Sequence, residues 1–452
     1  MSNQFNVSLW GDEGFSAILS MKSLPEIIRV IITDTSPPLW NIFEWIVFNT
    51  LGTDEIYIRL LAFTFFLGTV FFTYKIGEYL WGRRTGMLAA SLTFLNPFFF
   101  IYAFEGRMYS ILALGVTASM YFFLRIISEK KTKTVDKIGY VVAVLWAMYS
   151  HHFAIFAVFL QGMWFIYEFF KGNRKAAITI FKLFIAIGIG YLPWIIPLYN
   201  QTKMVGAGFW LGTPTATDLI GILGKYLGAG IPHSLQLIAP WPVVAIFVLR
   251  RWSKKFLKYD LFFVSWFLVP IALTWAVSQV FQSIFFDRYL LYTIPAAMLI
   301  LASQRRKMLS TIALAIVLFL FVNIDFHYFT NPTKRPFREL AAYVKETRQE
   351  GDFLVNWNAG SHHLWETKYY GIPAPIYVPG GEELPFFVGT ALMEEGDVIQ
   401  KIPEDTPRVG VVTSGSVDDI NLPGYTRKES ITLSADSPGA GEIHFVWLQK
   451  EK

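Results

Sequence analysis

The sequence has no cysteine and few charged residues. Of its 452 residues only 16% are Asp, Glu, Lys or Arg, whereas 54% are hydrophobic and 17% aromatic. Without cysteine, disulfides, thiolate catalysis and cysteine-ligated zinc are excluded. An ordinary soluble domain carries about 25% charged residues, so this composition indicates an integral membrane protein. No internal repeat with a period of about 20–50 residues is present, which excludes solenoids and propellers.

Ten apolar runs approach the length needed to cross about 30 Å of hydrocarbon. They lie at approximately 57–80, 85–103, 107–127, 138–150, 152–171, 176–198, 236–250, 259–280, 288–304 and 308–327. Every second connection between them is basic. These connections contain Arg83, Arg84, Lys130, Lys131, Lys133, Lys137, Lys171, Arg174, Lys175, Arg250, Arg251, Lys254, Lys255, Lys258, Arg305, Arg306 and Lys307. Because positive loops stay on the cytoplasmic side, the alternation predicts ten membrane-spanning helices and their orientation.

The orientation assigns the remaining segments to the outside of a cell membrane, which we expect to be a bacterial inner or plasma membrane. The external set comprises residues 1–56, the turns at 104–107 and 150–152, the loop 199–235 and everything after 330. The net charge of +5 comes from basic loops between spans, so no nucleic-acid partner is expected. The opening MSNQFNVSL is neither a signal peptide nor a span, and we expect a helix to precede it in the functional protein.

Three domains are predicted. Residues 1–56 form an external loop, in which 39–48 has the aromatic and aliphatic spacing of a helix lying in the membrane interface. Residues 57–330 form the transmembrane bundle. In 331–452 helical patterns near 335–350 and 361–371 alternate with strand patterns that begin near Phe353 and recur at APIYVPG, RVGVVTSG and EIHFVWLQK. This alternation predicts a small α/β domain, and no GxGxxG, Walker or zinc motif occurs in it.

Ionisable residues gather near the predicted outer boundary of the spans. They are Asp12, Glu13, Asp34, Arg59, Glu105, Arg107, Tyr109, His151, His152, Asp287, Arg288 and Tyr289. Charged groups at membrane depth are costly and tend to mark a site. A carboxylate can take the proton of an acceptor hydroxyl or amine, and an arginine can stabilise a departing phosphate. Neither ATP nor nucleotide sugars are available outside the cell, so the pattern favours a lipid-borne phosphate.

Each of these residues also has a structural interpretation. Asp12 and Glu13 could belong to a solvated loop, and Glu105 with Arg107 could form an ion pair that closes a turn. Arg59 could anchor a helix at the lipid headgroups. The two histidines are more often capping residues than metal ligands, and Asp287 with Arg288 could only set helix orientation. No cofactor is expected, and a divalent metal stays an unfavoured alternative.

Six motifs occur in an order that resembles a known family. WGDEGFSA, DTSPPLW, EGRMYSIL, YSHHFAIF, YLPWIIPL and FDRYLLYTIP, spread over about 300 residues, resemble the GT-C membrane glycosyltransferases. The most similar branch contains bacterial relatives of protein O-mannosyltransferases and of the aminoarabinose transferase that modifies lipid A. The resemblance implies transfer of a sugar from a polyprenyl-phosphate donor to an external lipid, glycan or protein, with inversion at the anomeric carbon. Membrane lipids are further partners.

The resemblance also implies roles for single residues. It assigns the base to Asp12, and it assigns to Glu13 a contact with Arg59 or Arg107. The residues predicted to bind the donor phosphate or substrate are Asp34, Arg59, Glu105, Arg107, Tyr109, His151, Arg288 and Tyr289. Two departures stand out: Ser36 replaces the histidine that many relatives have before Pro37 and Pro38, and the first transmembrane helix is absent.

Two other functions fit a multi-span protein. A transporter or flippase of lipid-linked sugars would need polar residues along a path through the bilayer, whereas here the mid-span positions are largely apolar. A catalytically inactive scaffold would bind the donor through its external domain without turnover. Sugar transfer, transport and scaffolding therefore remain the alternatives at the level of sequence.

Overall fold

The computed structural model describes residues 3–129, 132–249, 257–303, 308–357, 363–435 and 441–451. Contacts within the chain divide it into two compact units. The helical unit consists of Thr35–Trp40 and Leu60–Tyr328, and the loop–sheet unit consists of Met1–Asp34, Asn41–Arg59 and Phe329–Lys452. The loop–sheet unit thus joins the N-terminal segment with the C-terminal α/β segment.

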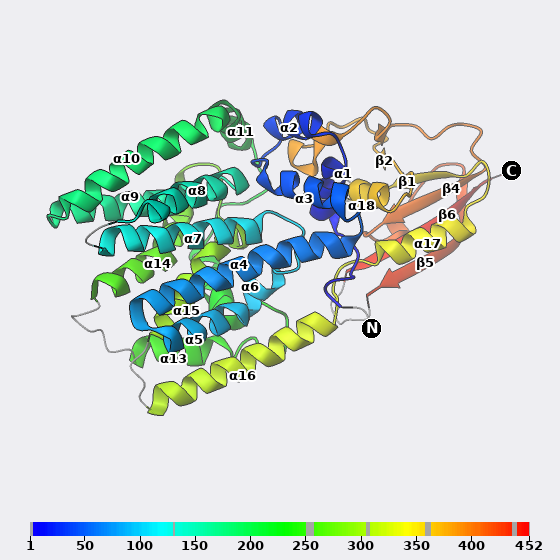
Figure 1. Ribbon diagram of the computed structural model, residues 1–452. Helices are drawn as coiled ribbons and strands as arrows, with labels where there is room; N and C mark the ends of the chain where they lie inside the picture. The colour runs from blue at the N-terminus through cyan, green and yellow to red at the C-terminus, as the bar shows by residue number, and fades with distance from the viewer. Residues whose placement is uncertain are drawn as a thin grey trace. The chain divides into compact units, whose positions relative to one another are not determined.

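The helical unit is built from helices, most of them α-helices (Figure 1). They are α4 (Glu55–Trp81), whose first turn belongs to the other unit, α5 (Arg83–Phe94), α6 (Pro97–Ile101), α7 (Tyr109–Ser128), α8 (Thr134–Ser150), α9 (Ala154–Phe170), α10 (Arg174–Tyr191), η1 (Leu192–Trp194), α11 (Ile195–Ala207), α12 (Ala216–Gly224), η2 (Lys225–Ala229), α13 (Pro240–Leu249), α14 (Leu257–Val280), η3 (Asp287–Tyr289), η4 (Leu291–Thr293), α15 (Ile294–Ala302) and α16 (Met308–Thr330).

Within the described residues, five helical segments are long and apolar enough to cross a membrane. They are Glu55–Trp81, Tyr109–Ser128, Arg174–Ala207, Lys258–Val280 and Met308–Thr330. The segments Ala154–Phe170 and Leu291–Ala302 are apolar but shorter. A multi-pass membrane protein is therefore confirmed, whereas the number of ten spans stays a prediction. The basic residues at 130–131, 250–255 and 305–306 lie outside the described residues, as does Lys307.

The predicted span 85–103 is broken in its middle. Helix α5 ends at Phe94, and the Asn96 side chain accepts a hydrogen bond from the backbone N–H of Phe99 at 3.0 Å, which caps α6. Pro97 occupies the first turn of α6, where its missing N–H costs nothing. An Asn-Pro pair therefore turns an apolar run into two short helices and brings the segment that follows, 102–108, into a loop.

Helices α7 and α8 pack closely through a small residue. A Cβ atom on Gly115 would lie 2.8 Å from the backbone nitrogen of Ala147, so only glycine permits this approach. Small residues are what allow helix backbones to pack closely in a membrane protein. The close pair fixes the start of α7 and the end of α8, which are the positions of Tyr109 and His151.

The loop–sheet unit begins with three helices, α1 (Gly11–Ser20), α2 (Leu24–Ile32) and α3 (Leu39–Thr50). Residues 39–48 are helical as the aromatic spacing predicts, and their interfacial position stays a prediction. Helix α1 packs on α18 (His363–Tyr369): a Cβ atom on Gly14 would lie 2.9 Å from the backbone of Trp365, and the Phe15 ring meets the Trp365 ring edge to face at 5.2 Å. The start of the chain is thus held by the C-terminal segment.

A six-stranded mixed sheet forms the rest of this unit. The strands are β1 (Phe353–Asn356), β2 (Ile376–Tyr377), β3 (Val398–Ile399), β4 (Arg408–Thr413), β5 (Tyr425–Ser434) and β6 (Glu442–Lys450), in the order β3-β2-β1-β4-β6-β5. Strands β3, β2, β1 and β4 are parallel, and β6 pairs antiparallel with both β4 and β5. The small sheet domain predicted from the alternating pattern is confirmed.

Alternation along the strands supplies a core on each face of the sheet. On one face Phe337, Leu340 and Val344 of α17 (Phe337–Thr347) pack with a cluster that includes Phe445 and Trp447; Figure 1 shows α17 beside the sheet. On the other face a second cluster is formed by Val355, Trp357, Val409, Val411, Leu422, Val446 and Leu448. Burial on both faces explains why the β4 sequence RVGVVT reads as an almost continuous apolar run.

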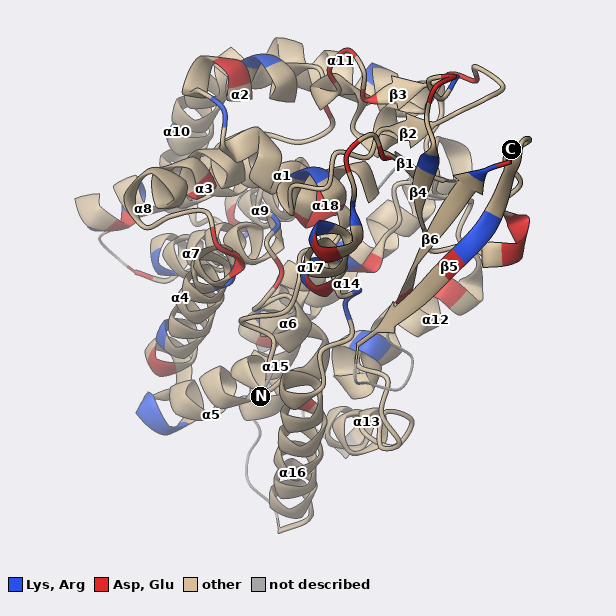
Figure 2. Ribbon diagram, turned by 90° about the vertical axis from the view of Figure 1, so that its right-hand side faces the viewer, with Lys and Arg blue, Asp and Glu red and all other residues tan. Residues whose placement is uncertain are grey.

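The sequence analysis missed β3 and β5. Strand β5 lies at the edge of the sheet, and its residues Thr426–Ser430 are exposed. Figure 2 shows basic and acidic residues along it, including Arg427, Lys428 and Glu429. Charges of this kind protect an edge strand from pairing with another chain. They also hide the strand from a search for apolar alternation.

Asp352→Asn should destabilise the α/β segment. Arg408 clamps Asp352 through Nε–Oδ1 and Nη2–Oδ2 contacts of 3.0 and 2.5 Å, and its guanidinium lies 3.8 Å from the centre of a Trp447 ring. A hydrogen bond between charged groups contributes about 1.5–3 kcal/mol to stability. The free energy of unfolding of the variant should fall by about this amount, as measured by thermal unfolding. Asp418→Asn is the control, because its partner Arg427 lies 3.3 Å away at an exposed position, and no measurable change is expected.

The contribution of Asp352 should also depend on pH. Burial raises the pKa of its carboxyl, but the hydrogen bonds and charge of Arg408 outweigh burial and lower the pKa on balance. A carboxyl group whose pKa is lowered in the folded state stabilises the folded protein at pH values above the pKa of the unfolded state, which is about 3.9. The difference in the free energy of unfolding between wild type and Asp352→Asn should therefore shrink as the pH falls below about 4. An equal difference at pH 7 and pH 3 would contradict this assignment.

Candidate active site

Glu13 is the centre of a buried ionic cluster in the loop–sheet unit. Arg59, in the first turn of α4, holds both carboxylate oxygens: Nη1 contacts Oε1, and Nη2 lies 2.9 Å from Oε2. Lys334 Nζ lies 2.9 Å from Oε2, and the backbone N–H of Trp10 donates to the same oxygen at 3.3 Å. The Glu13 and Arg59 side chains are 0% exposed. Two cations and a backbone donor around Glu13 favour the ionised form of its carboxyl group.

Asp12 is the neighbouring carboxylate, and it differs from Glu13 in exposure. It is partly exposed, whereas Glu13 is completely buried. Both lie in the first turn of α1, where the helix dipole favours negative charge. The bond from the Trp10 N–H to Glu13 fixes the start of this turn, so that the backbone that carries Asp12 is held in place by its neighbour. The two carboxylates are therefore suited to different roles.

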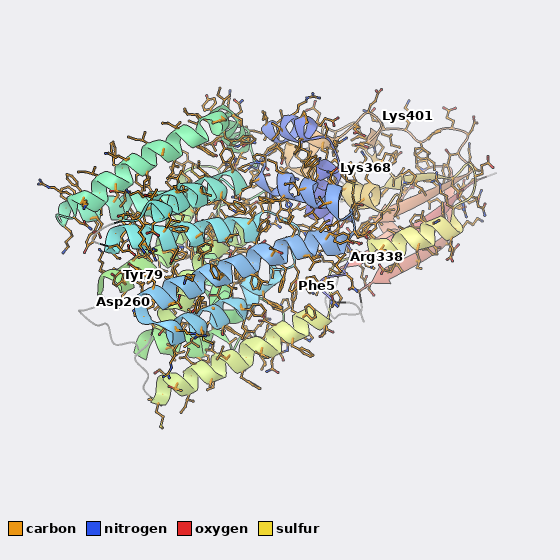
Figure 3. The ribbon with its side chains drawn as sticks, in the orientation of Figure 1. Phe5, Tyr79, Asp260, Arg338, Lys368 and Lys401 are labelled. Carbon is orange, nitrogen blue, oxygen red and sulfur yellow. The ribbon has the colours of Figure 1, made fainter. Side chains whose placement is uncertain are left out.

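A second network fixes the chain just before α1. The hydroxyl of Tyr370 donates to Glu55 Oε1 at 2.7 Å and accepts from the backbone N–H of Leu9 at 2.8 Å. Arg338, labelled in Figure 3, donates to the same Glu55 oxygen at 2.7 Å and to the carbonyl of Asn6 at 3.0 Å. Burial and then the charge of Glu55 raise the pKa of Tyr370, so its hydroxyl keeps its proton and can donate.

The helical unit holds a separate cluster around Arg288. Its guanidinium lies 5.5 Å from the centre of the Tyr109 ring and 4.7 Å from that of Phe286, and Nη1 is 3.9 Å from Glu105 Oε1. The side chain of Arg288 is 14% exposed. Stacking on two rings orients a guanidinium, and the planar fork of a guanidinium matches the geometry of a phosphate.

His151 and Tyr289 belong to this cluster. The ring centres of His151 and Tyr289 lie 4.8 Å apart, and those of Tyr109 and Tyr289 lie 6.1 Å apart. Nδ1 of His151 accepts from the backbone N–H of Phe153 at 3.1 Å, so this nitrogen carries no proton. Burial above all, with the nearby positive charges, lowers the pKa of His151. The ring is therefore neutral at pH 7 and adds a polar group rather than a charge.

Further hydrogen bonds shape the loop that carries Arg288. Asp287 accepts from Lys225 Nζ at 2.5 Å, and its backbone carbonyl accepts from the Tyr226 hydroxyl at 2.5 Å. The Arg288 N–H donates to Asp287 Oδ1 at 2.7 Å. Asp287 thus positions η3, and it is paired with a cation of its own.

The structure distributes the predicted residues over both units. Asp12, Glu13, Arg59 and Asp34 lie in the loop–sheet unit, where Asp34 is buried just past the end of α2. Contacts join Glu13 to Arg59 within this unit. In the helical unit, contacts join Glu105, Tyr109, His151, Arg288 and Tyr289. Arg107 shares the turn of Glu105, to whose carbonyl its N–H donates at 2.8 Å.

Sequence reasoning missed Lys334, Glu55 and Tyr370. Lys334 follows the last span in NPTKRPF, and such a cation just outside a membrane helix is a signal that could have been used. No pattern in the sequence connects Tyr370 with Leu9, because 361 positions separate them. In the described part of the chain, no group of three or more His, Asp or Glu side chains that could hold a metal ion is found.

Comparisons with known proteins find similarity only among solved structures. No protein-family description and no curated protein matches the sequence. The crystal structure of ArnT from Cupriavidus metallidurans in the apo state is similar with 11% identity and a TM-score of 0.44, over 98% of this chain and 94% of that one. The crystal structure of ArnT from the same organism bound to undecaprenyl phosphate is similar with 11% identity and a TM-score of 0.45, over 98% of this chain and 95% of that one.

A third similar structure is the archaeal oligosaccharyltransferase AglB from Archaeoglobus fulgidus, in complex with an inhibitory peptide and a dolichol-phosphate. Its identity is 11% and its TM-score 0.45, over 80% of this chain and 56% of that chain. ArnT is the lipid A aminoarabinose transferase, a protein of the group that the six sequence motifs resemble. At these identities and TM-scores no residue role is taken from the three structures.

Proposed function

We propose that the protein is a membrane glycosyltransferase of the GT-C type. It moves a sugar from a polyprenyl phosphate to an acceptor on the non-cytoplasmic side of the membrane. One observation supports this proposal above the others. A partly exposed carboxylate, Asp12, stands beside a completely buried carboxylate, Glu13, that two cations hold ionised. This is the arrangement expected of one base and one organiser.

The proposed reaction is a single displacement. Asp12 takes the proton of an acceptor hydroxyl or amine while the acceptor atom forms a bond to the anomeric carbon. The bond between that carbon and the phosphate oxygen breaks, and the polyprenyl phosphate leaves with the electron pair. Attack opposite the leaving group inverts the anomeric carbon. Glu13 keeps the turn of Asp12 in place, and a divalent metal stays an unfavoured alternative.

Arg288 is proposed to bind the phosphate of the lipid. Its guanidinium is partly exposed and is oriented by the rings of Tyr109 and Phe286. The neutral His151 and the hydroxyl of Tyr289 would add hydrogen bonds without adding charge. Glu105, Arg107 and Asp34 are proposed to shape the surroundings of the substrate.

Arg288→Ala should weaken donor binding by about 10–100-fold, the loss expected when a charge-assisted hydrogen bond is removed. Arg288→Lys should recover part of the affinity, because lysine restores the charge but not the planar fork. The control is Arg83→Ala at the exposed start of α5, which should bind normally. Binding of a radiolabelled polyprenyl phosphate to purified protein measures all three. Wild-type affinity in Arg288→Ala would remove Arg288 from this role.

The direct test of the proposed function begins with the lipid that copurifies with the protein. Mass spectrometry should detect a polyprenyl-phosphate sugar, which would identify donor class and sugar together. The purified protein should then release polyprenyl phosphate from this donor when an acceptor is present. A flippase would instead move the intact donor across the bilayer of reconstituted liposomes. Movement without loss of the sugar would overturn the transferase proposal.

A further inference from the structure

A serine, a histidine and a glutamate are joined in line within the loop–sheet unit. Ser414 Oγ lies 2.8 Å from His363 Nε2, and His363 Nδ1 lies 2.5 Å from Glu366 Oε2. The Glu366 side chain is 1% exposed and that of His363 4%, whereas Ser414 is partly exposed. None of the three belongs to the candidate active site described above. Ser414 is thus the most exposed of the three residues.

The order of the hydrogen bonds determines what the hydroxyl can do. An ionised carboxylate only accepts, so Glu366 requires the proton of a neutral His363 ring to be on Nδ1. Nε2 then has a free lone pair and accepts the hydrogen bond of the Ser414 hydroxyl. A base that is oriented by an acid and bonded to a hydroxyl is the arrangement that activates a serine nucleophile.

The fold explains why these residues meet. Ser414 directly follows β4, which pairs in parallel with β1, and α18 begins at His363. The carboxyl ends of parallel strands are where open α/β sheets place their ligands. Glu366 is one helical turn after His363 on α18, so that both side chains lie on the same face. The positions of Ser414, His363 and Glu366 are thus determined by the sheet and by α18.

Hydrogen bonds around Ser414, His363 and Glu366 hold the His363 ring in place. Thr367 Oγ1 donates to the carbonyl of His363 at 2.8 Å, and Asn356 Nδ2 at the end of β1 donates to Thr367 Oγ1 at 3.1 Å. The Trp365 indole donates to the carbonyl of Val388 at 2.9 Å. The ring of Phe337 lies 5.3 Å from that of His363. The catalytic geometry is therefore supported from several elements, and an apolar ring borders it.

We propose that Ser414, His363 and Glu366 form a second catalytic centre, one that cleaves carboxylic esters. Ser414 Oγ forms a bond to the ester carbonyl carbon, and its proton passes to His363 Nε2. The alcohol leaves with that proton, and an acyl-serine remains. Water then attacks the acyl carbon, gives a proton to His363, and releases the acid as the Ser414 hydroxyl is restored. The apolar border suits the acyl part of the substrate.

The experiment uses the purified full-length chain and a fluorescent fluorophosphonate, which reacts with activated serines. Peptide mass spectrometry should locate the label on Ser414 of the folded protein, and heat-unfolded protein should stay unlabelled. Ser414→Ala should lose the label. His363→Ala should react about 100-fold more slowly or less, as for removal of a general base. Ser416→Ala is the matched control, because Ser416 is exposed and its side chain accepts from the Asp418 N–H instead.

Two further measurements keep the result unambiguous. Glu366→Gln preserves the shape of the side chain and should slow labelling while the protein stays folded. Hydrolysis of p-nitrophenyl acetate should follow the same order of variants. Absence of label on Ser414 in folded wild type, or wild-type labelling of a folded His363→Ala protein, would overturn the proposal. Neither result depends on sugar transfer.

Discussion

Asp12→Asn should reduce sugar transfer by about 10²–10⁴-fold, the usual contribution of a positioned general base. The amide has the same shape as the carboxylate but cannot take a proton from the acceptor. Because Asp12 is partly exposed and Glu13 holds the start of α1, the variant should fold and bind donor as the wild type does. The expected result is a fall in kcat with little change in the donor KM.

The measurement is release of polyprenyl phosphate from the donor identified by mass spectrometry. Asp54→Asn is the matched control, since Asp54 is an exposed aspartate of the same unit, just before α4, and it should keep full activity. A supplied strong nucleophile such as azide, which needs no base, should restore part of the turnover of Asp12→Asn. Full turnover of the variant with its natural acceptor would show that Asp12 is not the base.

Much of the fold could be predicted because apolar residues recur at regular intervals along the sequence. The apolar spans indicate helices such as α7 and α16, and the start of β1 near Phe353 follows from the change of period after α17. What could not be predicted depends on single residues or on distant pairing. Asn96 and Pro97 divide one apolar run, and β5 is defined by its pairing with β6 rather than by its own exposed side chains.

The candidate site also has some features that could be predicted from the sequence and others that could not. The types of residue could be argued from charge, whereas their side of the membrane stays a prediction. The contact between Glu13 and Arg59 is one of the two that the family resemblance allowed. Tyr370 could not be found in this way, because its hydrogen bond to Leu9, 361 positions away, leaves no periodic pattern in the sequence. The same holds for Ser414 and His363, which meet only because β1 and β4 are neighbours.

Glu13→Gln should be the most destabilising single change at the ionic cluster. It leaves the guanidinium of Arg59, whose side chain is 0% exposed, without its charged partner. Breaking a buried ion pair by removing one partner costs about 3–5 kcal/mol. The variant should therefore unfold at a clearly lower temperature, measured by thermal unfolding of the purified protein. Sugar transfer should fall as well, because the turn that carries Asp12 loses its anchor.

The double variant Glu13→Gln/Arg59→Met separates charge from packing. Methionine fills part of the arginine volume and removes the buried charge, so the double variant should lose less stability than the sum of its two single variants. Arg427→Met is the control, because the side chain of Arg427 is 40% exposed and that of its partner Asp418 is 89% exposed, and an exposed pair contributes little. Wild-type unfolding of Glu13→Gln, or strict additivity in the double variant, would mean that Arg59 does not depend on Glu13. Recovered stability without recovered transfer would instead show that the cluster serves the position of Asp12 as well as the fold.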